Sequence, residues 1–241
     1  MECKSLEQAK RQEEIIENRG MVLTKGIAWA AIVGVDGSGK STVLRRLQQR
    51  EDELPCRGIE FLHRRPGAVY QSQKSAGGEI THYSKPNHGR FLSILKIAAM
   101  IVDWQVGYWT YIRRRWEEGY FVIADRHSLL DMLADPDRYR YGGHPGYVHL
   151  ALKIAPIPPL IFLLDAPIQV LQARKQELNQ TRLLHLRNSY LDIFSSWPGC
   201  TILDAARPVD VIVSDLVKAI AKGLNDSKPR HSSSWKSHYR S

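Results

Sequence analysis

The chain has 241 residues, 43% of them hydrophobic and 24% charged, which excludes a small scaffold that depends on disulfides and favours one sizeable α/β domain. The formal net charge of +9 favours anionic partners but does not distinguish nucleic acid from phosphorylated small molecules. The three cysteines are scattered with no Cys-x-x-Cys pair, so they predict a reducing compartment and no structural metal.

The chain begins with a polar segment, residues 1–25, that we expect to form an appended helix. It has no apolar run of the kind found in a secretory signal. The next run, Ile27 to Val33, is continuously apolar, which predicts a central parallel strand buried on both faces. A glycine-rich turn follows it, and Ser41 to Gln49 is predicted to be a helix.

Strands and helices then alternate through the predicted domain, residues 26–224. The further predicted strands are Gly58–His63, Tyr120–Asp125, Leu160–Leu164 and Thr201–Asp204. The further predicted helices are Arg90–Glu118, Tyr147–Ile154, Ile168–Gln176, Arg182–Phe194 and 208–224. This alternation predicts an α/β fold with a five-stranded parallel, Rossmann-like sheet flanked by helices on both faces. The basic tail, residues 225–241, is expected to be disordered.

The most hydrophobic stretch is Phe91 to Val106, which lies inside the longest predicted helix. Lys96 and Asp103 interrupt it, and it is shorter than the roughly 20 apolar residues that a membrane span needs. We therefore expect a buried helix in a soluble, cytoplasmic protein with no membrane partner.

The turn after the first strand carries the clearest chemical signal. Residues Gly34 to Ser41 read Gly-x-x-x-x-Gly-Lys-Ser, a P-loop, between a buried strand and an apolar helix. Glycines let backbone N–H groups turn toward phosphates, and the following helix presents its positive N-terminus. The motif predicts ATP and Mg²⁺ as cofactors, held by Gly34, Gly37, Ser38, Gly39, Lys40, Ser41 and Thr42. Lys40 would reach the β- and γ-phosphates, and the Ser41 hydroxyl would ligate the metal.

Asp36 stands inside this anion-binding loop, where a carboxylate is electrostatically unfavourable unless it has a function. It could orient a substrate hydroxyl or position Mg²⁺ through water. The alternative is a turn-forming aspartate that caps its own loop.

Three segments together resemble the thymidylate kinase family, a group of P-loop nucleoside monophosphate kinases. They are the loop Gly34–Thr42, the triplet Asp125-Arg126-His127, and the arginine-containing segment after Leu163-Leu164-Asp165-Ala166-Pro167. The resemblance extends from about Ile27 to Leu224. It implies transfer of the ATP γ-phosphate to the 5′-phosphate of thymidine monophosphate (dTMP) with Mg²⁺, and a homodimer formed through helices.

The resemblance also implies roles for residues on the acceptor side. Asp36 would touch the acceptor sugar or the metal, Asp125 would lie beside Mg²⁺, and Arg126 would clamp the acceptor phosphate. The alternative for Asp125 and Arg126 is a salt bridge at the strand end. The segment Phe61–Gly67 resembles the family's Phe-x-Arg-Glu-Pro-Gly, so Arg64 is a further acceptor-phosphate candidate, or otherwise a solvated loop charge.

A short lid over ATP is expected at about residues 174–187, because Ala173–Leu178 resembles the start of the family's lid. Related P-loops without an arginine place a catalytic arginine in the lid, which nominates Arg174 and then Arg182. Such an arginine would stabilise charge on the transferred group. The alternative is a helix-surface charge.

Several positions depart from the family pattern, so the acceptor stays open. The lid lacks the family's Asp-Arg-Ile-Glu, and the loop Arg138–Gly143 is not expected of a dedicated thymidylate enzyme. Where the family has Ala-Asp-Arg in the thymine pocket, this chain has Val102-Asp103-Trp104, which makes Trp104 a substrate-binding candidate. The acceptor is therefore dTMP, or a different small phosphorylated or hydroxyl metabolite.

Two other function classes compete with a kinase. A nucleotide-dependent switch or nucleic-acid-processing ATPase would suit the basic charge, but no nucleic-acid-binding signature and no apolar run ending in Asp-Glu is found. We therefore expect no nucleic-acid partner. The remaining alternative is a regulatory protein that binds nucleotide without chemistry.

Overall fold

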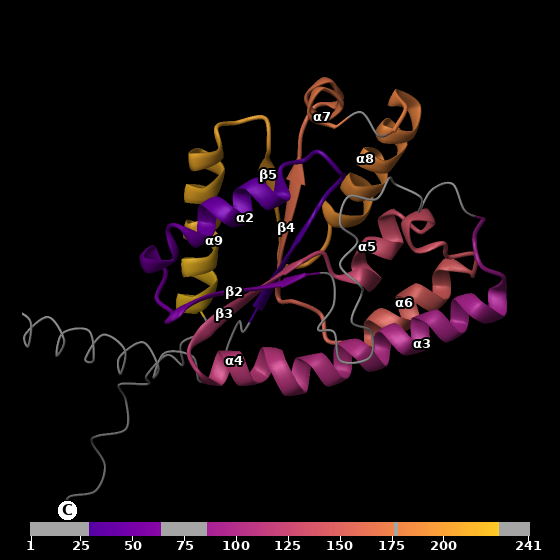
Figure 1. Ribbon diagram of the computed structural model, residues 1–241, viewed down its shortest axis with the longest axis horizontal. Coiled ribbons are helices and arrows are strands. Elements are labelled where there is room, and N and C mark those ends of the chain that lie inside the picture. Colours follow the sequence, from indigo (N-terminus) through magenta and orange to yellow (C-terminus); the bar gives the residue numbers. More distant parts are fainter. Residues whose placement is uncertain (1–28, 64–85, 176–177, 227–241) are drawn as a thin grey trace, which may run out of the picture.

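The computed structural model describes residues 29–63, 86–175 and 178–226 (Figure 1). The expected N-terminal helix, Arg64 and all but the first two residues of the tail lie outside these described residues. The strands are β1 (Trp29–Val33), β2 (Gly58–His63), β3 (Tyr120–Asp125), β4 (Leu160–Asp165) and β5 (Cys200–Asp204). Their positions agree closely with the strands predicted from the sequence.

Helices connect every pair of successive strands. The α-helices are α2 (Lys40–Gln48), α3 (Arg90–Gly107), α4 (Arg113–Glu117), α5 (Ser128–Ala134), α6 (Pro145–Ile154), α7 (Ile168–Arg174), α8 (Gln180–Phe194) and α9 (Val209–Asp226). Shorter helical segments are η1 (Glu51–Glu53), η3 (Asp137–Tyr139) and the π-helical η2 (Tyr108–Ile112). The long predicted helix after residue 90 is therefore α3, η2 and α4 in series, and the sequence pattern did not indicate the π-helical segment.

The five strands form one parallel sheet in the order β2-β3-β1-β4-β5. Every residue of β1 is buried, because this strand lies at the centre and is covered on both faces. The predicted five-stranded α/β fold is confirmed. β2 and β3 are added on one side of β1, and β4 and β5 on the other, so the order in which strands are added reverses at β1. Ligands of open α/β sheets bind at the carboxyl ends of the strands next to such a reversal.

Helices cover both faces of this sheet. In Figure 1, α2 and α9 lie on one side and α5, α6 and α8 on the other, while α3 and α4 run along the bottom of the view, with α3 below α6 and α4 below β3. The P-loop thus sits at the upper edge in this view, at the carboxyl end of β1. This edge also carries the last residues of β3 and β4, Asp125 and Asp165.

The helix α3 differs from the buried helix that we expected. One stripe along it is exposed, beginning at Phe91, which is 72% exposed, and continuing through Leu95 and Val102 to Trp109 in η2. The helical segment Arg90–Glu117 is long enough and apolar enough to cross a membrane, and 33% of its most apolar stretch is buried. The core helices of soluble proteins also meet these criteria. The expectation of burial was wrong for this face, because α3 lies at the margin of the domain and only its other face meets the sheet and α6.

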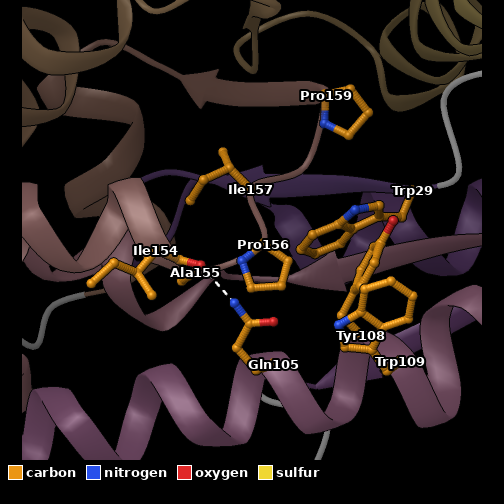
Figure 2. A pocket seen from close by; sticks show the side chains of 9 residues that line it. All are labelled: Trp29, Gln105, Tyr108, Trp109, Ile154, Ala155, Pro156, Ile157 and Pro159. Carbon is orange, nitrogen blue, oxygen red and sulfur yellow. Dashed lines mark hydrogen bonds between the residues drawn. The ribbon is translucent and has the colours of Figure 1, made fainter.

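The amino end of the sheet is packed with aromatic rings. Trp29 on β1 lies 5.5 Å from Trp104 and 6.3 Å from Tyr108, measured between ring centroids. A pocket of about 330 Å³ opens beside them (Figure 2), and uncharged residues line it: Trp29, Gln105, Tyr108, Trp109, Ile154, Ala155, Pro156, Ile157 and Pro159. Gln105 Nε2 donates across its rim to the carbonyl of Ile154 at 2.6 Å. The described residues that line this pocket therefore offer packing and no charge.

Candidate active site

The P-loop adopts a backbone that requires glycine. Gly34, Gly37 and Gly39 have φ of 141°, 85° and 89°, in the region that side chains disfavour. A Cβ on Gly34 would also lie 2.5 Å from the Leu164 carbonyl oxygen of β4. Gly39 is the residue before α2, and no acidic residue occupies the first turn of that helix. The loop and the positive helix end together form a cradle suited to a polyphosphate.

Lys40 opens α2 and folds back over the loop. Its Nζ donates to the carbonyls of Gly34 and Val35, both at 2.8 Å, and to Ser38 Oγ at 3.1 Å. Lys40 is 8% exposed, and burial, followed by the positive charge of Arg126, lowers the pKa of its ammonium to about 7. The ammonium is thus held at the phosphate cradle by weak partners that a phosphate oxygen could replace.

The other P-loop hydroxyls divide into two groups. Ser38 is buried and accepts from Lys40, so it supports the loop. Ser41 and Thr42 are exposed in the first turn of α2. The Ser41 hydroxyl is therefore open to a ligand at the end of the cradle.

Arg126 links β3 to the P-loop. Its φ of 73° is rare for a residue with a side chain, and its backbone N–H donates to the Ile32 carbonyl of β1 at 3.1 Å. The residue as a whole is 5% exposed, and its Nη2 donates to Asp36 Oδ1 at 2.6 Å. An unfavourable backbone conformation kept at such a position is typical of a functional site. The structure thus brings together Asp36 and Arg126, two residues that the sequence nominated separately.

Behind Arg126 lies Asp131 of α5, which is completely buried. Its Oδ1 accepts from Arg126 Nη1 at 2.8 Å and from the Tyr190 hydroxyl, and its Oδ2 accepts from the Tyr139 hydroxyl at 3.0 Å. Burial favours the neutral acid, but Arg126 and Arg138 outweigh it and hold the pKa of Asp131 below its usual value. Asp131 therefore orients Arg126 as a charged partner.

Arg138, which lies in the short η3 segment, reaches the same site. Its Nη2 donates to Asp36 Oδ2, while its Nε donates to Asp135 Oδ2 at 3.2 Å. Burial opposes ionisation of Asp36, but Arg126 and Arg138 together hold its pKa well below the ordinary aspartate range. Sequence reasoning did not select Arg138. The unusual loop Arg138–Gly143 was the available signal, because it adds charge where the family pattern offers none.

Asp125 and Arg174 lie on two sides of the P-loop. Asp125 ends β3, pairs in register with Ile32 of β1, and its negative charge acts on Lys40. Arg174 ends α7 and donates from Nη1 to the Ala205 carbonyl at 3.0 Å. A Cβ on Gly39 would lie 3.7 Å from Arg174 Nη1, so this guanidinium lies against the cradle.

Arg182 lies farther from the loop, at the start of α8. Its Nη2 donates to Asp137 Oδ2 at 2.9 Å. It lines a hollow of about 410 Å³ between η3 and α8, together with Ala134, Asp135, Pro136, Asp137, Asn179, Thr181, His185 and Leu186. In this structure Arg182 thus joins α8 to the turn that carries Arg138.

Trp104 is not at the carboxyl edge. It is fully buried, donates from Nε1 to Ser128 Oγ at 2.9 Å, and stacks on His127 with ring centroids 3.9 Å apart. A side chain in this position packs the amino end of the domain and has no surface for a ligand. The sequence pattern placed Trp104 at the helix position that serves the thymine pocket in the family. It could not tell in which direction the side chain points.

Sequence comparison finds relatives that span nearly the whole domain. The chain is 25% identical to a thymidylate kinase from Thermosipho africanus over 210 residues, covering 80% of this chain and 98% of the relative. It is 28% identical to a probable thymidylate kinase from Methanoculleus marisnigri over 217 residues, covering 83% and 97% of the two chains. No protein-family profile matches the chain.

Solved structures share the fold. The thymidylate kinase of Candida albicans is similar with a TM-score of 0.55 at 20% identity, covering 83% of this chain and 93% of that one. A deoxyadenosine kinase from M. mycoides is similar with a TM-score of 0.52 at 12% identity, covering 80% and 99%. The chain is thus similar to thymidylate kinases along most of its length, and these relatives together with the P-loop geometry support a P-loop phosphotransferase of the nucleoside monophosphate kinase type.

Proposed function

We propose that this enzyme transfers the γ-phosphate of ATP to the phosphate of dTMP or of a related phosphorylated acceptor. The observation that carries the proposal is the pairing of Asp36 in the P-loop with Arg126 after β3. The pairing holds an arginine side chain beside the phosphate cradle, where it could meet the phosphate of an acceptor. The kinase unit would comprise residues 26–224, with a lid at about 174–187.

The donor side works by backbone N–H groups and one ammonium. The P-loop N–H groups and the end of α2 would hold the β-phosphate, and Lys40 would leave the carbonyls of Gly34 and Val35 to meet the β- and γ-oxygens. Its lowered pKa of about 7 describes the ammonium without a ligand. A neighbouring polyphosphate would raise that pKa again, because an opposite charge favours the ionised form.

The residues present fit a Mg²⁺ ion. The exposed hydroxyl of Ser41 and the carboxylate of Asp125 are hard oxygen donors near the cradle, and Mg²⁺ commonly uses one or two protein oxygens, the phosphates and water. When bound, the ion would supply positive charge at the transferred phosphate. Among the residues that the structure describes, no group of three His, Cys, Asp or Glu side chains offers a different metal site.

The acceptor side works by positioning. Arg126, oriented by Asp131, would clamp the acceptor phosphate in line with the donor, with Arg64 as a second candidate from the segment outside the described residues. Arg174, against Gly39, would stabilise the charge that spreads over the transferred group. Arg182 would join the ATP side only if the lid turned it away from Asp137.

A non-nucleotide phosphorylated metabolite is the second candidate acceptor. The observation that favours it is the burial of Trp104, because the helix position that serves the thymine pocket in the family here packs the core. A site without that pocket would select its acceptor by the phosphate and by other contacts.

A coupled assay for ADP with purified protein, Mg²⁺ and ATP tests both candidates. The acceptors would be dTMP, dUMP, dCMP, AMP, GMP, thymidine and a set of sugar phosphates. We expect turnover with dTMP or with one other phosphorylated compound, and none with thymidine. Turnover of thymidine alone, or ATP hydrolysis that only nucleic acid stimulates, would contradict the proposal.

A further inference from the structure

The carboxylate of Asp36 holds two guanidinium groups at once. Arg126 Nη2 donates to Oδ1 and Arg138 Nη2 donates to Oδ2. The side chains of both arginines are largely buried, 7% and 15% exposed. Each guanidinium gives one N–H to a different oxygen of Asp36, so two cations bind one oxyanion from two directions through charge-assisted hydrogen bonds, as arginines that bind phosphates do.

Arg138 is fixed before any ligand arrives. Asp135 accepts from the backbone N–H of Arg138 at Oδ1 and from its Nε at Oδ2, both at 3.2 Å. Asp135 is itself buried, and Pro136 begins the short turn that carries Arg138. A long side chain that is already ordered loses little conformational entropy when it binds, so the site is preorganised.

A merely structural role explains only part of this geometry. If Arg138 served to neutralise its own turn, the contacts with Asp135 and the 3.9 Å approach to Asp131 would be enough. Instead its Nη2 extends to a P-loop residue 102 positions earlier in the chain. The guanidinium therefore faces the space between the phosphate cradle and Arg126, where the acceptor would meet the donor.

The charges suggest what belongs in that space. Asp36, Asp131 and Asp135 are matched by Arg126, Arg138 and the ammonium of Lys40. In this arrangement Asp36 is the oxyanion that the two guanidinium groups share. A phosphate presents paired oxygens like those of the Asp36 carboxylate, so Asp36 occupies the position that an acceptor phosphate would take between the two arginines. Once the phosphate binds them, the Asp36 carboxylate could accept a hydrogen bond from a hydroxyl of the acceptor.

We propose that Arg138 is an acceptor-binding residue that grips, together with Arg126, the phosphate of the acceptor, while Asp135 orients it. This inference rests on the proposed function and assigns a further residue to the recognition of the acceptor's phosphate monoester. It also explains how a loop outside the family pattern contributes to selection, since the added guanidinium favours the charged acceptor over its dephosphorylated form.

Nuclear magnetic resonance of the arginine side chains tests the contact directly. The full chain would be labelled with ¹⁵N-arginine, and the Nε signals assigned with Arg126→Lys and Arg138→Lys. Inorganic phosphate and dTMP would be titrated separately in the presence of Mg²⁺ and a non-hydrolysable ATP analogue. We expect both ligands to shift the Nε signals of Arg126 and Arg138, and not that of Arg113, an exposed arginine of α4.

Kinetics supply the second measurement. Arg138→Lys keeps the charge and loses the fork, so we expect a rise of about 10- to 100-fold in the KM for the acceptor. The Kd for the ATP analogue should stay within about twofold, and Arg113→Lys should leave both values unchanged. A rise in the Kd of the analogue equal to the rise in KM would indicate a general structural defect and overturn the assignment.

The outcomes separate the two proposals. Wild-type turnover of a phosphorylated acceptor with an unmoved Arg138 signal would overturn the role of Arg138 and leave the proposed function standing. Failure of the wild type to phosphorylate any acceptor would defeat the proposed function. The titration with inorganic phosphate would then still decide the role of Arg138, because it requires no turnover.

Discussion

The two ends of the sheet are built on opposite principles. At the carboxyl end, Lys40, Arg126 and Asp131 are charged residues that are 8%, 5% and 0% exposed. At the amino end, Trp29 and Trp104 pack with other rings around an uncharged pocket. Burying charge is unfavourable unless each charge is paired, whereas burying rings is favourable without further conditions. The charged end is therefore the one that a function must maintain.

Two adjacent residues, Arg126 and His127, send their side chains to these two regions. The φ of 73° at Arg126 sends its side chain to the P-loop, while the next residue, His127, stacks on Trp104 at 3.9 Å. His127 Nε2 lies 3.0 Å from the Pro156 carbonyl, and Nδ1 accepts from the Leu130 N–H at 3.4 Å. Adjacent residues of the Asp-Arg-His triplet thus contribute to different regions: Arg126 to the candidate active site and His127 to the aromatic core.

The largest expected effect separates activity from stability at the charged end. Lys40→Ala should lower kcat/KM by at least about 10³-fold, because in the proposed function the ammonium would stabilise charge on the transferred phosphate. The melting temperature should be unchanged or higher, because a buried ammonium is removed. The assay and a thermal melt measure both quantities. Arg45→Ala, at an exposed position on the same helix, should change neither.

The opposite pattern is expected at the aromatic end. Trp104→Ala should lower the free energy of unfolding by about 3–5 kcal/mol, since a large fully buried side chain leaves a cavity and Ser128 loses a donor. Denaturant titration gives this value. The Kd for an ATP analogue, measured where the variant is folded, should change by less than about threefold. A loss of nucleotide binding equal to that of Lys40→Ala would erase the distinction between the two ends.

The pH dependence of the free energy of unfolding should reveal the buried imidazole of His127 at the aromatic end. Burial lowers the pKa of His127 to about 3, so between pH 6.5 and pH 3 the unfolded chain binds a proton that the folded chain does not. Stability should fall as the pH falls through this window, by about 1.4 kcal/mol per pH unit where the difference is complete. Denaturant titrations at several pH values measure this slope. In His127→Gln the slope should be smaller, and an identical slope would contradict the burial of a neutral imidazole.

The smallest effect is expected on the exposed face of α3. Val102→Ala removes a side chain only two residues from Trp104, but one that is 51% exposed. The free energy of unfolding should change by no more than about 0.5 kcal/mol. Denaturant titration beside Trp104→Ala provides a matched pair on one helix. A change as large as that of Trp104→Ala would mean that this face is covered in solution.

The sequence predicted the sheet well because apolar runs such as that of β1 are a local signal. The P-loop glycines and Lys40 were equally local, since their spacing itself determines the cradle. Arg138 could not be found in this way, because its role depends on reaching Asp36, far away in the chain. The exposure of Phe91 was also hidden, because hydrophobicity alone does not tell which face of a helix meets the core.

The most direct test of the central claim follows the phosphate itself. ATP labelled at the γ-phosphate would be incubated with the wild-type enzyme, Mg²⁺ and the acceptor series, and the labelled products identified by mass spectrometry. If the enzyme transfers phosphate as proposed, the label appears in a diphosphate product formed on the acceptor's existing phosphate. Asp36→Asn and Arg126→Lys should reduce the amount of this product. Label that is found only in free phosphate, or on a hydroxyl of an uncharged acceptor, would contradict the account.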